Sequence, residues 1–283
     1  MFCHMLFMTV CLMGSGGQAS AGVWPIRLTC EYRVNPMGID ASAPRLGWVV
    51  ESQQRGQVQT AYQVIAATSV ENLSADRADL WDSGKVESSD SVHVVYTGRP
   101  PASGQRVYWK VRVWDRDGRA SAWSAPAWWE MGLLDPQDWQ GQWICSPCPL
   151  PEQPEDFYAD DPAPLLRREF EVRGPIRQAR AYVSGLGYYE LRLNGRKVGD
   201  RLLDPGWTSY AQRVLYSAYD VTDLLKEGNN AVGIILGNGW YNPLPLRMWG
   251  RLDLRKHLTV GKPRAILQLN IEYADGTHQS VAT

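Results

Sequence analysis

The loop at residues 237–243 carries the side chains of this chain that are best suited to binding chemistry. It has the sequence Gly-Asn-Gly-Trp-Tyr-Asn-Pro, in which two amides, Asn238 and Asn242, flank Trp240 and Tyr241. An amide both donates and accepts hydrogen bonds, and an indole offers a flat apolar face. A pyranose ring presents hydroxyl groups at its edge and C–H groups on its face, which suits this mixture. The loop therefore predicts a carbohydrate-binding site made by Asn238, Trp240, Tyr241 and Asn242.

The same residue types also have architectural interpretations. Asn-Gly at 238–239 is typical of a turn whether or not a ligand binds there. Trp240 and Tyr241 suit a hydrophobic core as well as a stacking platform. The sequence leaves both alternatives open at each of these positions.

Hydrolysis of a glycoside usually needs two carboxyl groups that face one pocket. The spacing of the aspartates does not bring any two of them to a common site. Asp220 and Asp223 match the cap and the first-turn acid of a short helix. We therefore predict no catalytic residue in this chain. The aspartates that qualify by residue type alone are Asp200, Asp204, Asp220, Asp223 and Asp253.

Short strands are expected to position the loop. Tyr189, Leu191 and Leu193 alternate with polar residues, which is the period of a half-buried strand. Asn194-Gly195 fits a two-residue hairpin turn, which requires positive φ at both positions. Residues 231–236 are predicted to form the strand that delivers the loop. Further strands are expected at residues 165–172, 179–184 and 265–273.

The first half of the chain has the regular strand and turn spacing of a β-sandwich. We predict an all-β protein with a fibronectin III or immunoglobulin-like sandwich at residues 22–133. A connector and linker rich in Pro, Glu and Asp follow at 134–164. A jelly-roll-like sandwich is expected at 165–283. It should be truncated at its C-terminus, because the chain stops just after a return strand begins.

Two runs in the second half carry a family resemblance. They are YYELRLNGRKVGDRLLDPGWTSY at 188–210 and LYSAYDVTDLLKEGNNAVGIILGNGWY at 215–241. They resemble the N-terminal β-domain of bacterial α-L-rhamnosidases, glycoside hydrolase family 78. The opening at Asn35–Asp40, followed by Pro-Arg-Leu-Gly-Trp at 44–48, is similar to the start of many members. The resemblance extends from about Arg27 to the end of the chain.

The resemblance implies a family reaction and a set of partners. Terminal α-L-rhamnose is hydrolysed with inversion in a separate (α/α)₆ barrel placed later in the chain, which would leave this chain non-catalytic. The implied partners are a rhamnose-containing glycan and that barrel, encoded in the same or an adjacent reading frame. Some β-domains of the family resemble a calcium-dependent rhamnose-binding module, which implies Asp204 and Asn238 as Ca²⁺ ligands. The alternative is a stand-alone lectin-like or adhesive β-protein with no enzymatic relation.

The first 21 residues are predicted to be a signal peptide. Met5–Met13 is apolar, and Ala-Ser-Ala at 19–21 fits the small-x-small cleavage pattern. Cleavage there would make Gly22 the first residue of an exported protein, periplasmic or extracellular. Because only His4 precedes the apolar run, a mis-assigned start codon is the alternative interpretation.

The net charge, hydropathy and cysteine content bear on which partners and compartments are expected. The net charge of −1 gives no electrostatic reason to expect nucleic acid or an anionic membrane surface. No later segment is apolar over the ~20 residues that a bilayer span needs. Cys30, Cys145 and Cys148 would remain after cleavage, and an odd number argues against a disulfide framework. Prolines follow Cys148, so the C-x-x-C pattern favours a surface loop over a redox helix.

Overall fold

The structure is a computed structural model that describes residues 22–159, 162–248 and 250–283. The chain divides into two compact units. One contains the described residues up to Pro36, together with Ala41–Pro101 and Arg106–Trp129. The other contains Met37–Asp40, Ala102–Gln105 and Glu130–Thr283. None of the helices formed by the described residues is long and apolar enough to cross a membrane.

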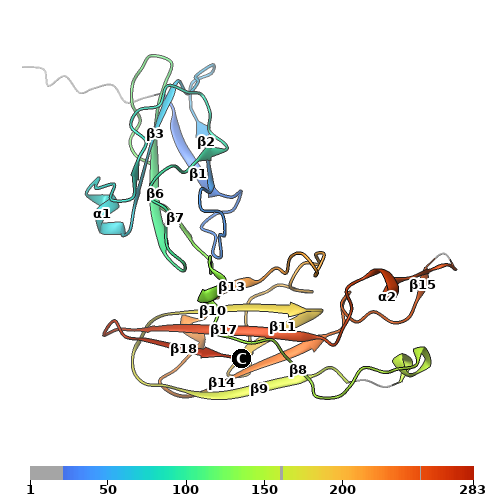
Figure 1. Cartoon of the computed structure of the whole chain (residues 1–283). Coiled ribbons are helices and arrows are strands. Elements are labelled where there is room, and N and C mark those ends of the chain that lie inside the picture. Colours follow the sequence, from blue (N-terminus) through green and yellow to red (C-terminus); the bar gives the residue numbers. More distant parts are fainter. Residues whose placement is uncertain (1–21, 160–161, 249) are drawn as a thin grey trace, which may run out of the picture. The chain divides into compact units, whose positions relative to one another are not determined.

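The first unit is a sandwich of two antiparallel sheets (Figure 1). Strand β6 supplies much of the core, because Trp109, Val111 and Val113 alternate along it and are fully buried. Helix α1 (Val70–Ser74) connects β3 to β4. One sheet contains β1 (Trp24–Cys30), β2 (Arg45–Glu51) and β5 (Val94–Val95), in that order, and the other contains β4 (Trp81–Asp82), β3 (Ala61–Ala67), β6 (Arg106–Trp114) and β7 (Ala127–Glu130).

The second unit is also a sandwich of antiparallel sheets. The first sheet has the order β13 (Ser217–Asp220), β10 (Ile176–Leu186), β17 (Arg264–Tyr273) and β18 (His278–Ala282). The second has the order β12 (Arg196–Lys197), β11 (Tyr188–Leu193), β14 (Gly228–Gly237) and β9 (Leu165–Val172). The predicted all-β fold with two sandwiches is confirmed.

Smaller elements complete the second unit. Strand β8 (Ile144–Cys145) lies within the stretch expected to be a connector, and it pairs with β17 beside Ala265. Strands β15 (Arg247–Met248) and β16 (Leu252–Asp253) form a separate hairpin that leads into helix α2 (Leu254–His257). The remaining turns of 3₁₀-helix are η1 (Pro136–Asp138), η2 (Pro154–Tyr158) and η3 (Thr222–Leu224).

Strands β11 and β14 form the pair that leads to the loop of interest. Leu191 lies opposite Ile234 and Tyr189 lies opposite Leu236, and all four side chains are buried between the sheets. Asn194 has φ of 51° and Gly195 has φ of 81°, so both turn positions adopt the positive φ expected from the Asn-Gly pair. That turn joins β11 to β12, while the pairing of β11 with β14 places Gly237, at the end of β14, opposite Tyr188, at the start of β11.

A buried ion pair lies within the second unit, to which Glu130, the last residue of β7, belongs. Arg180 on β10 donates from Nε and Nη2 to the two carboxylate oxygens of Glu130, at 2.6 and 3.1 Å, and both side chains are almost fully buried. Its Nη1 lies 2.9 Å from Asp220 Oδ2. Burial disfavours the charged guanidinium, but the two carboxylates more than compensate and raise the pKa of Arg180. The pair keeps two charged groups satisfied inside the protein.

Replacing Arg180 with Ala should destabilise the second unit by about 3–5 kcal/mol, because Glu130 would lose its bidentate partner while buried. Arg177→Ala on the same strand is the matched control. Arg177 is 68% exposed and pairs with Glu272 at 2.8 Å. Exposed pairs typically contribute no more than about 1 kcal/mol. Urea denaturation measures both free energies of unfolding, and equal losses in the two variants would contradict this interpretation.

Candidate functional site

The loop that follows β14 is closed by its own amides. The Asn242 main-chain N–H donates to the Asn238 carbonyl at 3.0 Å, and Asn242 Nδ2 donates to Asn238 Oδ1 at 3.0 Å. Gly239 has φ of 49°, and a Cβ at this position would lie 3.1 Å from the Gly187 Cα. A glycine therefore fits the close approach of the two segments. Asn238 and Gly239 thus do form a turn, and the turn fixes where the amides lie.

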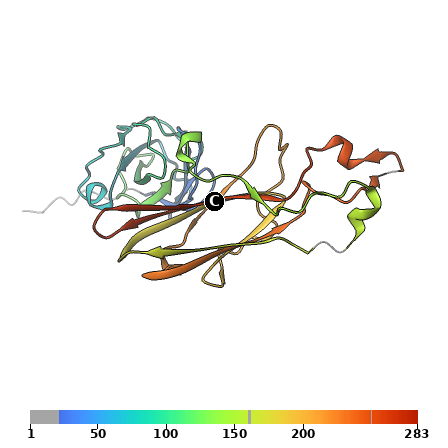
Figure 2. The same cartoon turned by 60° about the horizontal axis from the view of Figure 1, so that its bottom comes forward.

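Arg255 holds the second amide in place. Its Nη1 donates to Asn242 Oδ1 at 2.9 Å and to the Pro243 carbonyl at 2.7 Å. The guanidinium carbon also lies 4.1 Å from the centroid of the Phe157 ring. Figures 1 and 2 place α2, which carries Arg255, and η2, which carries Phe157, at the same end of the second unit. The loop is therefore supported by elements that are far apart in the sequence.

Two neighbouring cavities open beside these amides. Their volumes are about 450 and 290 Å³, and Asn238 and Asn242 line both. Cavities of this size are typical of small-ligand sites. Asp156 lines both cavities, and Lys262 lines the larger one, where its Nζ donates to the Ser146 carbonyl at 2.7 Å. The site thus offers amide, carboxylate and ammonium groups to a polar ligand.

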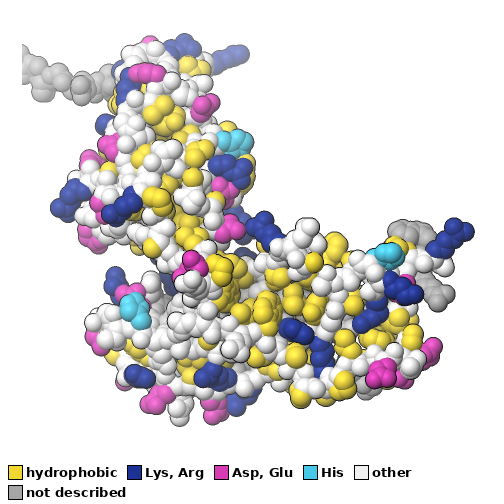
Figure 3. Space-filling model, viewed as in Figure 1, with side chains coloured by type: hydrophobic (Ala, Val, Ile, Leu, Met, Phe, Trp, Pro, Cys, Tyr) yellow, Lys and Arg dark blue, Asp and Glu magenta, His cyan; other side chains and the backbone are white. Residues whose placement is uncertain are grey.

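The two aromatic residues of the loop have different environments. Tyr241 is 7% exposed and packs edge-on against Tyr210, with ring centroids 5.5 Å apart. Trp240 is 43% exposed and lies against Trp207, which is 52% exposed, with centroids 6.2 Å apart and planes tilted by 48°. Tyr241 is therefore a packing residue, whereas Trp240 and Trp207 present indole surface to solvent. Figure 3 shows further hydrophobic side chains exposed on the visible face of this unit.

Trp207 was not among the predicted site residues. It lies far from the loop in sequence, and only the fold brings it to Trp240. The run Asp-Pro-Gly-Trp at 204–207 was a usable signal, because Pro-Gly favours a turn and connecting segments run over the protein surface.

Asp204 has a role in packing. Its Oδ2 accepts hydrogen bonds from Ser217 Oγ at 2.7 Å and Tyr219 Oη at 2.8 Å, and also from Tyr189 Oη. Burial, followed by the hydrogen bond to Asp204, raises the pKa of Tyr189, so its hydroxyl stays protonated and donates. Arg201 Nη1 lies 3.7 Å from the other oxygen, Oδ1. Asp204 thus ties β11 and β13 to the segment between them.

These contacts do not fit a calcium ion held jointly by Asp204 and Asn238. Asp204 is occupied by hydroxyl donors, and Asn238 Oδ1 already accepts from Asn242. The Arg255 cation also lies on the loop, where it would repel a metal ion. Within the described ranges, no group of three or more His, Cys, Asp or Glu side chains is placed to hold a metal ion. The loop amides and Asp204 belong to different hydrogen-bond networks. The predicted carbohydrate-binding loop and the predicted calcium ligand Asp204 therefore do not form one site.

Comparison with known proteins assigns both parts of the chain. Residues 25–135 match the model of a Rha78A-like, N-terminal immunoglobulin domain, and residues 174–283 match that of the alpha-L-rhamnosidase N-terminal domain. An α-L-rhamnosidase of Formosa agariphila is 36% identical over 269 residues, and one of Alteromonas sp. is 36% identical over 261 residues. Each alignment covers 89% of this chain but only 28% and 27% of the respective relative.

Solved structures agree with the sequence comparison. The α-L-rhamnosidase of Dictyoglumus thermophilum is 34% identical with a TM-score of 0.81, over 94% of this chain and 29% of that one. The Streptomyces avermitilis α-L-rhamnosidase complexed with L-rhamnose is 26% identical with a TM-score of 0.81, over 92% of this chain and 40% of that one. The fold and these matches define a pair of β-sandwich domains of the kind found at the N-terminus of α-L-rhamnosidases. The chain belongs to the α-L-rhamnosidase family and corresponds to its N-terminal domain region.

Truncation of the two loop aromatics should have unequal effects on stability. Trp240→Ala removes a half-exposed ring and should change the free energy of unfolding by less than about 1 kcal/mol. Tyr241→Ala empties a packed position and should cost about 3 kcal/mol or more. Chemical denaturation of the two variants measures the difference. A larger loss for Trp240→Ala would mean that Trp240 is a core residue after all.

Proposed function

We propose that this chain is the non-catalytic, carbohydrate-binding N-terminal part of an exported α-L-rhamnosidase. The family reaction is hydrolysis of terminal non-reducing α-L-rhamnose residues, which the resemblance assigns to a separate (α/α)₆ barrel. The ligand of the second unit would be a rhamnose-containing glycan.

One observation carries the binding proposal. The exposed indoles of Trp207 and Trp240 contact each other, and Trp240 lies in the same loop as Asn238, an amide that lines the larger cavity. An indole covers the apolar face of a sugar ring, while amide and charged groups reach its hydroxyls. The Streptomyces avermitilis relative, whose structure holds L-rhamnose, supports rhamnose as the first sugar to test.

The carboxylates support the non-catalytic part of the proposal. Asp204 is occupied by hydroxyl donors, and Asp220 accepts from Thr222 and pairs with Arg180. Asp253 accepts from the Arg255 main-chain N–H at 3.1 Å as the cap of α2. Each of these groups has a structural role. None of them forms the facing acid and base pair that glycoside hydrolysis requires.

L-Rhamnose should bind the chain weakly, with a dissociation constant of about 1 mM, because a shallow site buries little area and ordering it opposes binding. Trp240→Ala and Trp207→Ala should each weaken binding by about tenfold, the equivalent of one lost ring contact of ~1.4 kcal/mol. Chelation should leave binding unchanged, because the loop amides and Asp204 do not form a calcium site. Titration calorimetry with and without EDTA measures these effects.

Trp143→Ala is the matched control for the binding experiment. Trp143 is 39% exposed in the same unit, but it lies outside the loop at residues 237–243 and outside the Trp207–Trp240 pair. Its removal should leave the affinity for rhamnose unchanged. Absence of rhamnose binding by the unmodified chain, or an equal loss in all three variants, would refute the assigned site.

The purified chain should not hydrolyse an aryl α-L-rhamnoside, because Asp204, Asp220 and Asp253 are engaged in structural contacts and no facing pair of carboxyl groups is formed by them. Release of the aryl group is followed by absorbance against a buffer blank. Turnover that remains with the 283-residue chain through a second purification would overturn the non-catalytic assignment.

A further inference from the structure

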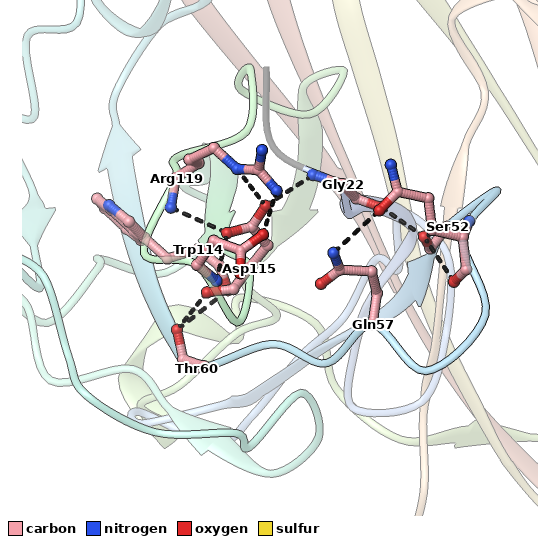
Figure 4. A network of polar contacts seen from close by, with 9 residues as sticks. Gly22, Ser52, Gln57, Thr60, Trp114, Asp115 and Arg119 are labelled. Atoms are coloured by element: carbon pink, nitrogen blue, oxygen red, sulfur yellow. Dashed lines mark hydrogen bonds and ion pairs between the residues drawn. The ribbon is translucent and has the colours of Figure 1, made fainter. Parts of the chain in front are cut away.

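The beginning of the first unit is held by a buried carboxylate. The Gly22 main-chain nitrogen lies 2.9 Å from Asp115 Oδ2 (Figure 4). Asp115 follows β6 directly and is 0% exposed. Gly22 immediately precedes the segment that leads into β1. The contact thus joins two parts of the unit that are 93 positions apart in the sequence.

The Asp115 carboxylate is held in place by further donors. Its Oδ1 accepts from the main-chain N–H groups of Asp117 and Arg119, both at 2.9 Å, and Arg119 Nε donates to Oδ2 at 3.0 Å. Burial alone would favour the neutral acid. The hydrogen bonds from Gly22, Arg119 and Asp117 outweigh it and lower the pKa of Asp115 to about 2. The carboxylate is therefore ionised at neutral pH and turned toward Gly22.

Ser52 and Gln57 also lie against residue 22. Ser52 Oγ donates to the Gly22 carbonyl at 2.5 Å. A Cβ on residue 22 would lie 2.8 Å from the side-chain nitrogen of Gln57, the movable end of a flexible side chain, so Gln57 packs close to Gly22. Gln57 Oε1 is buried and has no hydrogen-bond partner among the described residues. A spare acceptor is therefore present on the side chain that packs against Gly22.

The sequence predicts cleavage at the bond that precedes this glycine. Hydrolysis of the Ala21–Gly22 peptide bond by a processing peptidase consumes one water, leaves a carboxylate on Ala21 and leaves an amine on Gly22. An α-amino group has a pKa of about 8 and takes up a proton at neutral pH. The single neutral N–H donor of the peptide bond thereby becomes an ammonium group with three donors. Charge-assisted hydrogen bonds of this kind are roughly twice as strong as neutral ones.

The local charge favours that change. Asp115, Asp117 and Arg119 contact one another through the two ion pairs of Arg119, and together they carry a net charge of −1. An ammonium group at Gly22 would neutralise the cluster. Arg116 lies between these residues in the sequence, but its guanidinium donates to the Gly56 carbonyl. It is therefore not counted in the charge of the cluster.

We propose that the mature chain begins at Gly22 and that its α-ammonium group is bound by the carboxylate of Asp115. Cleavage then creates an ion pair between Gly22, just before β1, and Asp115, just after β6. The first unit becomes more stable once its leader is removed.

Two purified forms test the proposal directly, one beginning at Gly22 and one beginning at Ala21. They differ by a single residue, which moves the ammonium group away from Asp115. Reductive methylation of the α-amine, followed by mass spectrometry, measures its reactivity in the folded and urea-unfolded states. Folding should slow labelling of Gly22 by about tenfold or more, as a pKa raised by one unit would. Folding should change labelling of Ala21 much less.

Melting curves provide a second readout. The form beginning at Gly22 should melt about 4 °C or more above both the Ala21 form and a form acetylated on Gly22. In an Asp115→Asn background these differences should vanish. If that variant does not fold, the comparison of the three N-termini decides. N-terminal sequencing of exported protein should find Gly22 first. A different mature start, or equal labelling and equal melting of the Gly22 and Ala21 forms, would overturn the proposal.

Discussion

The pairing register of β11 with β14 is the constraint on which the second unit depends. Side chains on a strand alternate between faces, so a shift by one residue would turn the buried side chains of the shifted strand outward. Leu191 and Leu193 on β11 meet Ile234 and Val232 on β14, and all four are buried. A shifted register would expose this apolar surface to water, so the observed register is strongly favoured. The loop begins where it does because β14 ends opposite Tyr188.

Buried polar groups in this unit are satisfied by one another, which decides the roles of the acidic residues. Asp204 accepts from Ser217 and Tyr219, and Glu130 receives two donors from Arg180. An unpaired carboxylate in these positions would carry a large desolvation penalty. The same hydrogen bonds that make burial tolerable give Asp204 and Glu130 structural roles.

The aromatic residues divide between structure and recognition according to where the fold places them. Trp109 and Trp129 are fully buried in the first unit, and Tyr241 is packed in the second. Trp207 and Trp240 instead remain exposed as a contacting pair, and Trp240 lies in the same loop as Asn238, an amide that lines a cavity. An exposed indole forgoes the favourable free energy of burial. Exposed apolar side chains near polar groups are typical of surfaces that bind ligands.

The sequence by itself determined the all-β class, the two sandwiches, the Asn194-Gly195 turn and the strand that delivers the loop. These features are local, because alternation and turn chemistry are written in neighbouring residues. The family also followed from contiguous runs of sequence. Only the tertiary structure decided that Trp240 meets Trp207, that Tyr241 is buried and that Asp204 serves packing. The same holds for Gly22 and Asp115. Each of these outcomes depends on which distant segments meet in the fold. The local sequence around a residue does not specify which distant segment will pack against it.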